Sequence, residues 1–255
     1  IRREFHLEGL NLDDAEEVAG FVERTAIDNQ KRIMLWREIS KNCLEGTISS
    51  TWETDGEIEW RFDENKGRLI IKGKGPLVTY ADGNKSCRMR KYNCWTKDEC
   101  SPWSKKYREE IRSVVVCYGV SEIGHDAFVN CTSLRSVIIP EGVISIGNCA
   151  FRGCKVLSKI FIPESVKSIC VNPFIECEQL RSITIASGNQ HFVVVNNVLF
   201  DKGITCLKSY TAYTSSAYEV PNTVTSIDGG AFNGCTGLAS IIIPDSVKNI
   251  GGYAF

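Results

Sequence analysis

The chain has 255 residues, of which 43% are hydrophobic, and its 30 basic and 31 acidic side chains leave a formal net charge of −1. This composition is typical of a globular domain, and the balanced charge predicts no binding to nucleic acid or to an anionic membrane. Even the longest apolar runs are short, residues 137–139 being an example, so no membrane insertion is expected. The chain opens without Met or a signal-peptide hydrophobic region and ends within a repeat, which we interpret as a fragment or a mature chain without its targeting signal.

Residues 1–45 are predicted to form a helical segment. Asp13, Asp14, Glu16 and Glu17 place negative charge where it favours the start of a helix. Apolar residues then recur along one helical face, at Leu12, Ala15, Val18, Ala19 and Val22. A further helical stretch is expected around residues 33–39. We interpret the segment as a cap on the open end of the repeats that follow, because terminal coils need one; a partner-binding helix and the tail of a preceding domain are the alternatives.

Residues 46–108 are expected to form a β-rich cap segment. Ile58, Trp60 and Phe62 alternate with polar residues, which predicts strands within residues 56–80. A basic insertion follows, with Cys87, Cys94 and Cys100 and with the basic residues Lys85, Arg88, Arg90, Lys91, Lys97, Lys105 and Lys106.

Three interpretations of the insertion's cysteines are open. A zinc site is disfavoured because the spacings exceed the short C-x₂₋₄-C of structural zinc. One disulfide with one free thiol is the second interpretation, and an exposed loop with incidental cysteines is the favoured one. The basic side chains would suit an anionic glycan or nucleic acid, but a solvated loop is again favoured.

Residues 109–255 are built from a repeat of 23 residues, since Phe128, Phe151 and Phe174 follow one another at that spacing, as do Phe232 and Phe255. Each copy holds a short alternating strand that ends at proline, which cannot donate to a ladder, and an Ala-Phe-x-x-Cys turn. Stacked copies share one core. We therefore predict a continuous parallel sheet and a ladder of stacked rings. The sheet residues are Val114, Val137, Ile160, Ile183 and Ile241; the rings are Phe128, Phe151, Phe174 and Phe232.

Two further features belong to the repeats. Residues 186–223 form an irregular unit, in which Asn196-Asn197 is predicted to turn a hairpin. Cysteines recur at one repeat position and are predicted to be buried, reduced thiols, because free Cys is among the most buried residue types. They are Cys131, Cys154, Cys177 and Cys235.

The sequence offers little chemistry for catalysis. His125-Asp126 is the one dyad-like pair, but it falls at a variable repeat position where a solvent-facing turn is expected. The common catalytic motifs for serine hydrolases, zinc proteases and phosphate loops do not occur in the chain. We therefore predict a protein that is not an enzyme and that has no cofactor and no metal site.

A column of side chains on the outward side of the repeat strands is the candidate partner-binding site. These residues lie between the inward-facing ones and are Val115, Ile138, Phe161, Thr184, Glu219 and Ile242. Four of the six are large and apolar, which suggests an interaction surface if the sheet face is solvated. The alternative is that β-branched residues simply favour strands. Phe161 is the favoured anchor, since aromatic residues are enriched at binding hot spots.

The repeats resemble the BspA-type leucine-rich repeat family, whose template is similar to V-x-x-I-G-x-x-A-F-x-x-C-x-x-L-x-x-I-x-I-P. Residues 67–75 and 101–114 also resemble the segment that precedes the first repeat in many members. The resemblance covers roughly residues 54–255. It implies an α/β solenoid, a leucine-rich repeat right-handed superhelix with a β-rich N-terminal segment and an N-terminal helix.

The same resemblance implies a secreted or cell-surface protein of bacteria or anaerobic protists that acts in adhesion and recognition, and it carries no catalytic residues. We predict a module that binds a protein or glycan partner. A structural spacer or stalk of a larger surface protein is the alternative.

Overall fold

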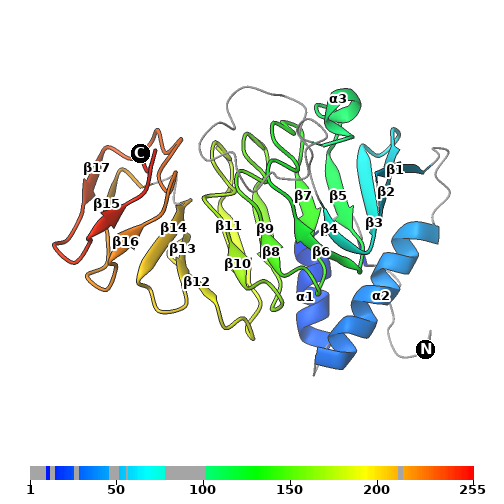
Figure 1. Cartoon of the computed structure of the whole chain (residues 1–255), viewed down its shortest axis with the longest axis horizontal. Coiled ribbons are helices and arrows are strands. Elements are labelled where there is room, and N and C mark those ends of the chain that lie inside the picture. The colour runs from blue at the N-terminus through cyan, green and yellow to red at the C-terminus, as the bar shows by residue number, and fades with distance from the viewer. Residues whose placement is uncertain are drawn as a thin grey trace.

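The computed structural model describes residues 10–11, 15–25, 29–45, 52–55, 57–77, 101–211 and 215–255. It is an elongated β-solenoid of about six stacked coils of about 23 residues, with two helices packed along one side (Figure 1). The predicted fold class is confirmed. Residues 78–100, with Cys87, Cys94, Cys100 and most of the basic insertion, lie outside the described residues.

The N-terminal end of the solenoid is an antiparallel unit. β1 (Glu53–Asp55) pairs with β2 (Ile58–Asp63), which pairs with β3 (Arg68–Gly73). Ile58, Trp60 and Phe62 are buried on the core side of β2, as their alternation predicts. β3 then pairs in parallel with the first repeat strand, so this unit joins the sheet of the repeats directly.

Each coil contributes one strand to each of two facing sheets. On the first side lie β5 (Ser113–Val116) and β7 (Ser136–Ile138), which pair with each other, and next to them a separate pair, β9 (Lys159–Ile162) and β11 (Ser182–Ile185). The second contains β4 (Gly75–Leu77), β6 (Val120–Ile123), β8 (Ser145–Ile146) and β10 (Ser168–Ile169). α3 (Ser104–Tyr107) precedes the first coil.

The irregular unit interrupts this order. β12 (Phe192–Val195), β13 (Val198–Asp201) and β14 (Cys206–Tyr210) form an antiparallel meander, and the predicted hairpin turn is confirmed. Asn196 and Asn197 both have positive φ, 51° and 61°, as a two-residue type I′ hairpin requires. The chain continues in β15 (Ala217–Glu219), β16 (Ser226–Ile227), β17 (Ser240–Ile242) and β18 (Asn249–Ile250).

The prediction of one continuous parallel sheet is wrong at two places. β7 and β9 are neighbours but belong to separate ladders, and the order changes again beyond β11. Ile241 pairs with Tyr218 in a separate two-stranded ladder of β15 and β17. The physical reason is the meander, since β14 leads directly into a ladder with β16 and β18 and leaves β15 and β17 to pair with each other.

The aromatic ladder divides at the same place. Trp103, Phe128, Phe151 and Phe174 stack with ring centroids 5.5 to 5.9 Å apart. Phe232 instead belongs to a second core cluster, where it packs between Tyr210 and Phe255 at 5.1 and 5.2 Å. The predicted single ladder is therefore wrong between Phe174 and Phe232. Trp103 takes the ring position ahead of the first repeat, and its indole N–H donates to the carbonyl of Ala127 at 3.0 Å.

The cysteine ladder is confirmed as buried for Cys131, Cys154 and Cys177, whereas Cys235 is only partly buried; all four are free thiols. The thiols of Cys154 and Cys177 donate to carbonyl oxygens one coil earlier, at Phe128 (3.2 Å) and Phe151 (3.1 Å). Burial raises the pKa of each thiol, to about 12 for Cys131 and Cys235. These cysteines therefore act as small core side chains that also connect coils.

Candidate interaction surface

The outward face of the first sheet is covered by the chain's own helices over β5, β7 and β9. α1 (Ala15–Thr25) and α2 (Asn29–Glu45) lie along these strands (Figure 1). Together they are called the helical cover. The side chains between the cover and the sheet form a hydrophobic cluster separate from both core clusters: Val18, Val22, Leu35, Trp36, Ile39 and Cys43 from the helices, and Ile70, Val115, Cys117 and Ile138 from the sheet side.

The structure arranges the six predicted partner-binding residues as three register pairs. Val115 lies opposite Ile138, Phe161 opposite Thr184, and Glu219 opposite Ile242. The three pairs belong to three different ladders, so the predicted column is not one continuous row.

The expectation that this column meets solvent is wrong for its first three members. Val115 is 1% exposed, Ile138 is 3% exposed and Phe161 is 7% exposed. The reason is the position of the helices, which lie on the outward face of the sheet. Thr184, Glu219 and Ile242 are exposed as expected, and Ile242 is 63% exposed. Partner binding by these three stays a prediction.

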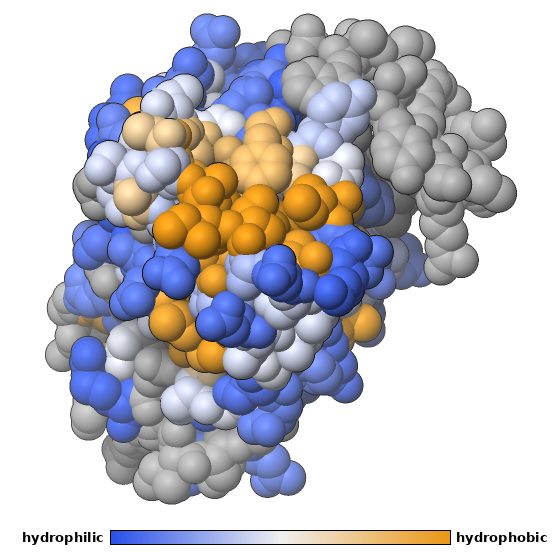
Figure 2. Space-filling model, turned by 90° about the vertical axis from the view of Figure 1, so that its left-hand side faces the viewer, coloured by the Kyte–Doolittle hydropathy of each residue, from blue (hydrophilic) through white to orange (hydrophobic). Residues whose placement is uncertain are grey.

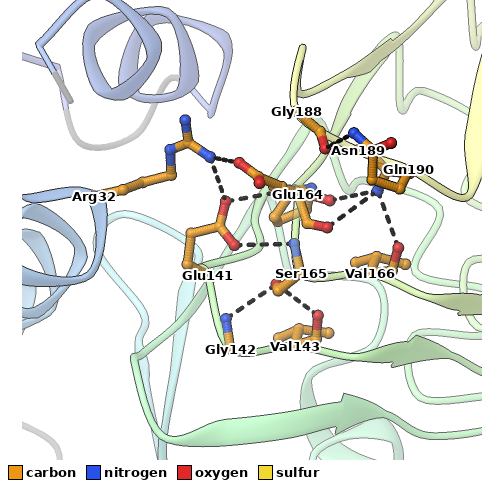
Figure 3. Close-up of polar contacts among 11 residues, drawn as sticks. Arg32, Glu141, Gly142, Val143, Glu164, Ser165, Val166, Gly188, Asn189 and Gln190 are labelled. Atoms are coloured by element: carbon orange, nitrogen blue, oxygen red, sulfur yellow. Dashed lines mark hydrogen bonds and ion pairs between the residues drawn. The ribbon is translucent and has the colours of Figure 1, made fainter. Parts of the chain in front are cut away.

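Arg32 of α2 connects the helical cover to the loops of two successive coils (Figure 3). Its guanidinium forms an ion pair with Glu164, and its Nη1 lies 3.8 Å from Oε1 of Glu141. Glu141 follows Pro140 and Glu164 follows Pro163, so a single repeat position supplies both carboxylates. Sequence reasoning missed this contact because the spacing of the repeats does not show which side of the coil receives α2.

The Glu141 carboxylate is held from within the solenoid as well. The backbone N–H groups of Glu164 and Ser165 donate to its two oxygens at 3.1 and 3.0 Å, and the side chain is 4% exposed (Figure 3). The Ser165 hydroxyl donates to the carbonyl of Val143 at 2.8 Å. Burial raises the pKa of Glu141, and the bonds from Ser165 and the charge of Arg32 only partly oppose that rise. This carboxylate therefore joins coils to one another and to the cover.

Asn189 extends the same polar network into the irregular unit. Its side-chain amide donates to the carbonyls of Pro163 and Val166, both at 3.0 Å. Its side-chain oxygen accepts from the backbone N–H groups of His191 and Phe192 at 2.8 and 2.9 Å. Asn189 is fully buried, so every one of these groups is satisfied without water, and the joint between the regular and irregular coils is fixed.

Three further contacts fasten the helical cover. The hydroxyl of Ser40 accepts from the backbone N–H of Tyr118 at 2.9 Å. The guanidinium of Arg61 donates to the carbonyl of Leu44 at 2.9 Å, and that of Arg37 lies 4.8 Å from the centre of the Tyr118 ring. The first two contacts satisfy polar groups that the apolar cluster would otherwise leave unpaired.

Exposed apolar side chains gather at the last coil (Figure 2), where Ile242, Ile243, Ile250, Tyr253 and Phe255 are all exposed. Ile243 and Phe255 occupy repeat positions whose earlier counterparts, such as Ile162 and Phe174, are covered by the following coil. They are stacking positions of the solenoid. Ile242 lies instead at the outward position of its strand, opposite Glu219.

His125 and Asp126 are part of the coil-to-coil bonding, and the expectation of a solvent-facing turn is wrong for Asp126, which is 9% exposed. Nδ1 of His125 accepts from the backbone N–H of Asn148 at 2.7 Å, and Oδ1 of Asn148 accepts from that of Val171 at 3.0 Å. Burial lowers the pKa of His125. The same repeat position thus links three successive coils.

Within the described ranges, no group of three or more His, Cys, Asp or Glu residues is placed to hold a metal ion. In the same part of the chain, no helix has the length and apolarity needed to span a bilayer.

The family model described as the BspA type leucine rich repeat region matches residues 106–211 and 207–255, with six copies. No curated protein matches the chain.

Solved structures of bacterial proteins are similar to this chain, and the first two below share its fold. A leucine rich cell surface protein from Faecalibacterium prausnitzii is 23% identical with a TM-score of 0.54, over 82% of this chain and 75% of that one. The pneumococcal vaccine antigen PcpA is 16% identical with a TM-score of 0.51, over 82% and 68% of the two chains. A leucine-rich repeat protein from Eubacterium ventriosum is 25% identical with a TM-score of 0.47, and the match spans 80% of this chain but only 62% of that protein.

Proposed function

Because the chain belongs to the BspA-type leucine-rich repeat family, we propose that it is a recognition or adhesion module that binds a protein partner. The proposed site is the uncovered part of the outward sheet face. Ile242 is its anchor, and Glu219 lies opposite Ile242 in the ladder of β15 and β17. Thr184 is the exposed outward residue of β11, in a separate ladder. No catalytic step is assigned. The proposed location is the cell surface or the medium, in line with the Faecalibacterium protein that is named a cell surface protein.

The observation that carries the proposal is the exposure of Ile242. It is 63% exposed at an outward strand position, whereas its counterpart Ile138 is covered by the helices. Large apolar side chains on a solvated sheet mark interaction surfaces, and they favour a protein partner over a glycan. Glu219, opposite Ile242 in the ladder, adds a charge at the rim that would give orientation to the complex.

The experiment compares two substitutions of one residue type. Immobilised protein captures partners from extracts of surface proteins, and binding of the captured partner is then measured for Ile242→Ser and Ile144→Ser. Ile144 is 43% exposed but lies before β8, on the side of the second sheet. We expect Ile242→Ser to weaken binding by about 2 kcal/mol or more, about 30-fold, and Ile144→Ser to leave it unchanged.

Equal affinities of the two variants would contradict the proposal. A spacer or stalk is the alternative, and one observation favours it: three of the four apolar side chains of the column, Val115, Ile138 and Phe161, are buried within the chain itself. If the chain is a spacer, Ile242→Ser and Ile144→Ser should both capture the same proteins as the unmodified protein, with the same affinity.

A further inference from the structure

A row of arginine side chains lies at the start of the strands on the first side of the solenoid. Arg112, Arg135 and Arg181 each follow a buried Ile or Leu and stand one residue before a strand, at β5, β7 and β11. All three side chains are exposed. Ser158 occupies the same repeat position before β9. The three arginines are called the arginine row, and Ser158 is the gap in it.

The backbone holds the arginine row in line. The N–H of Arg135 donates to the carbonyl of Arg112 at 2.8 Å, and the N–H of Arg181 donates to the carbonyl of Ser158, also at 2.8 Å. Because strands of adjacent coils lie ~4.8 Å apart, the row extends about 14 Å along the solenoid from Arg112 to Arg181. The stacked coils therefore present a straight row of positive charges.

No carboxylate neutralises the arginine row: within the residues that the structure describes, none forms an ion pair with its three members. The acidic residues of the turn before Arg181 are paired elsewhere. Glu176 pairs with Arg152 at 3.4 Å, and Glu178 pairs with Lys155 at 3.2 Å. Like charges that lie opposite each other on adjacent strands destabilise a sheet. A bound anion would remove this repulsion, so the row favours an anionic ligand.

The side chains beside the row favour a sugar polymer over nucleic acid. Ser136 and Ser182 each follow an arginine of the row, and Ser158 fills its gap. Their hydroxyls can both donate and accept hydrogen bonds, as sugar hydroxyls do. Single-stranded nucleic acid is bound largely by stacking its bases on aromatic rings. Among the described residues the exposed aromatic side chains, Tyr253 and Phe255, lie in the last coil.

We propose that the arginine row binds an acidic polysaccharide, a linear sugar polymer that carries carboxylate or sulfate groups. Each guanidinium pairs with one anionic group, since its planar fork offers two parallel N–H donors to a single oxyanion. The serine hydroxyls beside the row bond the sugar hydroxyls. This site goes beyond the proposed function, because it lies apart from Ile242 and does not require a protein partner there.

The first experiment measures binding of the full chain to immobilised polymers by surface plasmon resonance. Polygalacturonate carries carboxylates, dextran sulfate carries sulfates, and single-stranded poly-dT is the nucleic-acid probe. The ionic strength is about 0.1 M, at which charges more than about 10 Å away are largely screened. We expect saturable binding to a polysaccharide, and the polymer bound more tightly identifies the anionic group. Binding to neither polysaccharide, or tighter binding to poly-dT, would overturn the proposal.

A matched pair of variants separates the arginine row from the overall charge of the protein. Arg135→Gln and Lys167→Gln each remove one exposed positive charge, but Lys167 lies before β10, on the second side of the solenoid. We expect Arg135→Gln to weaken binding about three- to fivefold, the upper range for one exposed ion pair. Lys167→Gln should leave the affinity unchanged, and equal losses for the two variants would overturn the proposal.

A second pair tests the row by filling its gap. Ser158→Arg adds a fourth cation in line, whereas Ser158→Gln adds a long side chain without charge. We expect Ser158→Arg to bind the polymer about three- to fivefold more tightly than Ser158→Gln, and equal affinities would contradict the site. Ile242→Ser should bind the polymer as the unmodified protein does. A loss of polymer binding in Ile242→Ser would place the polymer at the last coil and overturn the proposal.

Discussion

Truncation of the central ring of the first aromatic stack, by Phe151→Ala, is expected to cost about 3–5 kcal/mol of the free energy of unfolding. The Phe151 ring is fully buried, and it stacks on Phe128 at 5.5 Å and on Phe174 at 5.9 Å, with interplanar angles of 16° and 11°. Both faces of the ring lose contacts when it is removed, and coils on either side of it are fixed by backbone bonds that limit collapse of the cavity.

Phe255→Ala is the matched control for this prediction. Its ring occupies the same repeat position but is 58% exposed, and among the described residues it stacks on Phe232 alone, at 5.2 Å. A single ring contact is worth about 0.5–1.5 kcal/mol beyond area burial, so we expect a loss of roughly 1 kcal/mol. Urea denaturation followed by circular dichroism gives both values. Equal losses for the two variants would refute the assignment of Phe151 to a doubly packed stack.

Two other predictions follow from single residues. The raised pKa of Glu141 means that folding favours its protonated form. Relative to Glu141→Gln, the free energy of unfolding of the unmodified protein should therefore increase as the pH falls through that raised pKa. The increase should be complete below 4.5, the ordinary pKa of glutamate. Urea denaturation of both proteins between pH 7 and 4 measures the difference, and parallel pH profiles would contradict the assignment. Asn197 has a φ of 61° in the β12–β13 turn, so Asn197→Val should cost about 1–2 kcal/mol while Asn197→Gly is nearly neutral; an equal cost for both, by thermal denaturation, would argue against the turn.

The repeats were predictable because each coil buries the same few side chains at the same spacing. The strand residues Val114, Val137, Ile160 and Ile183 and the buried cysteines lie where the 23-residue period places them. The hairpin at Asn196-Asn197 was predictable as well, since asparagine tolerates positive φ better than most residues.

The break after β11 was not predictable from the same period. The sequence shows that residues 186–223 leave the template, but the template cannot say which of the two sheets the following strands join. The positions of β14 and β15 depend on long-range pairing with β16 and β17, and such pairing has no local signature.

The sequence contains a signal that part of the outward column is covered and not exposed to solvent. Parallel strands that are covered on both faces show nearly continuous apolar runs. β5 reads Ser-Val-Val-Val and β9 reads Lys-Ile-Phe-Ile, while β11 and β15 carry Thr184 and Glu219 at the outward position. The change from continuous to alternating marks the limit of the helical cover. Trp36 and Ile39 then identify the segment that provides the covering face.

The most direct test of the account is the stability of Phe161→Ser. Phe161 is 7% exposed, packs against Ala186 and lies on β9 beneath α1. If the helices cover the outward face of the sheet, the loss of this ring should lower the free energy of unfolding by about 3 kcal/mol or more in urea denaturation. An unchanged free energy of unfolding would show that Phe161 meets solvent, and would contradict the account.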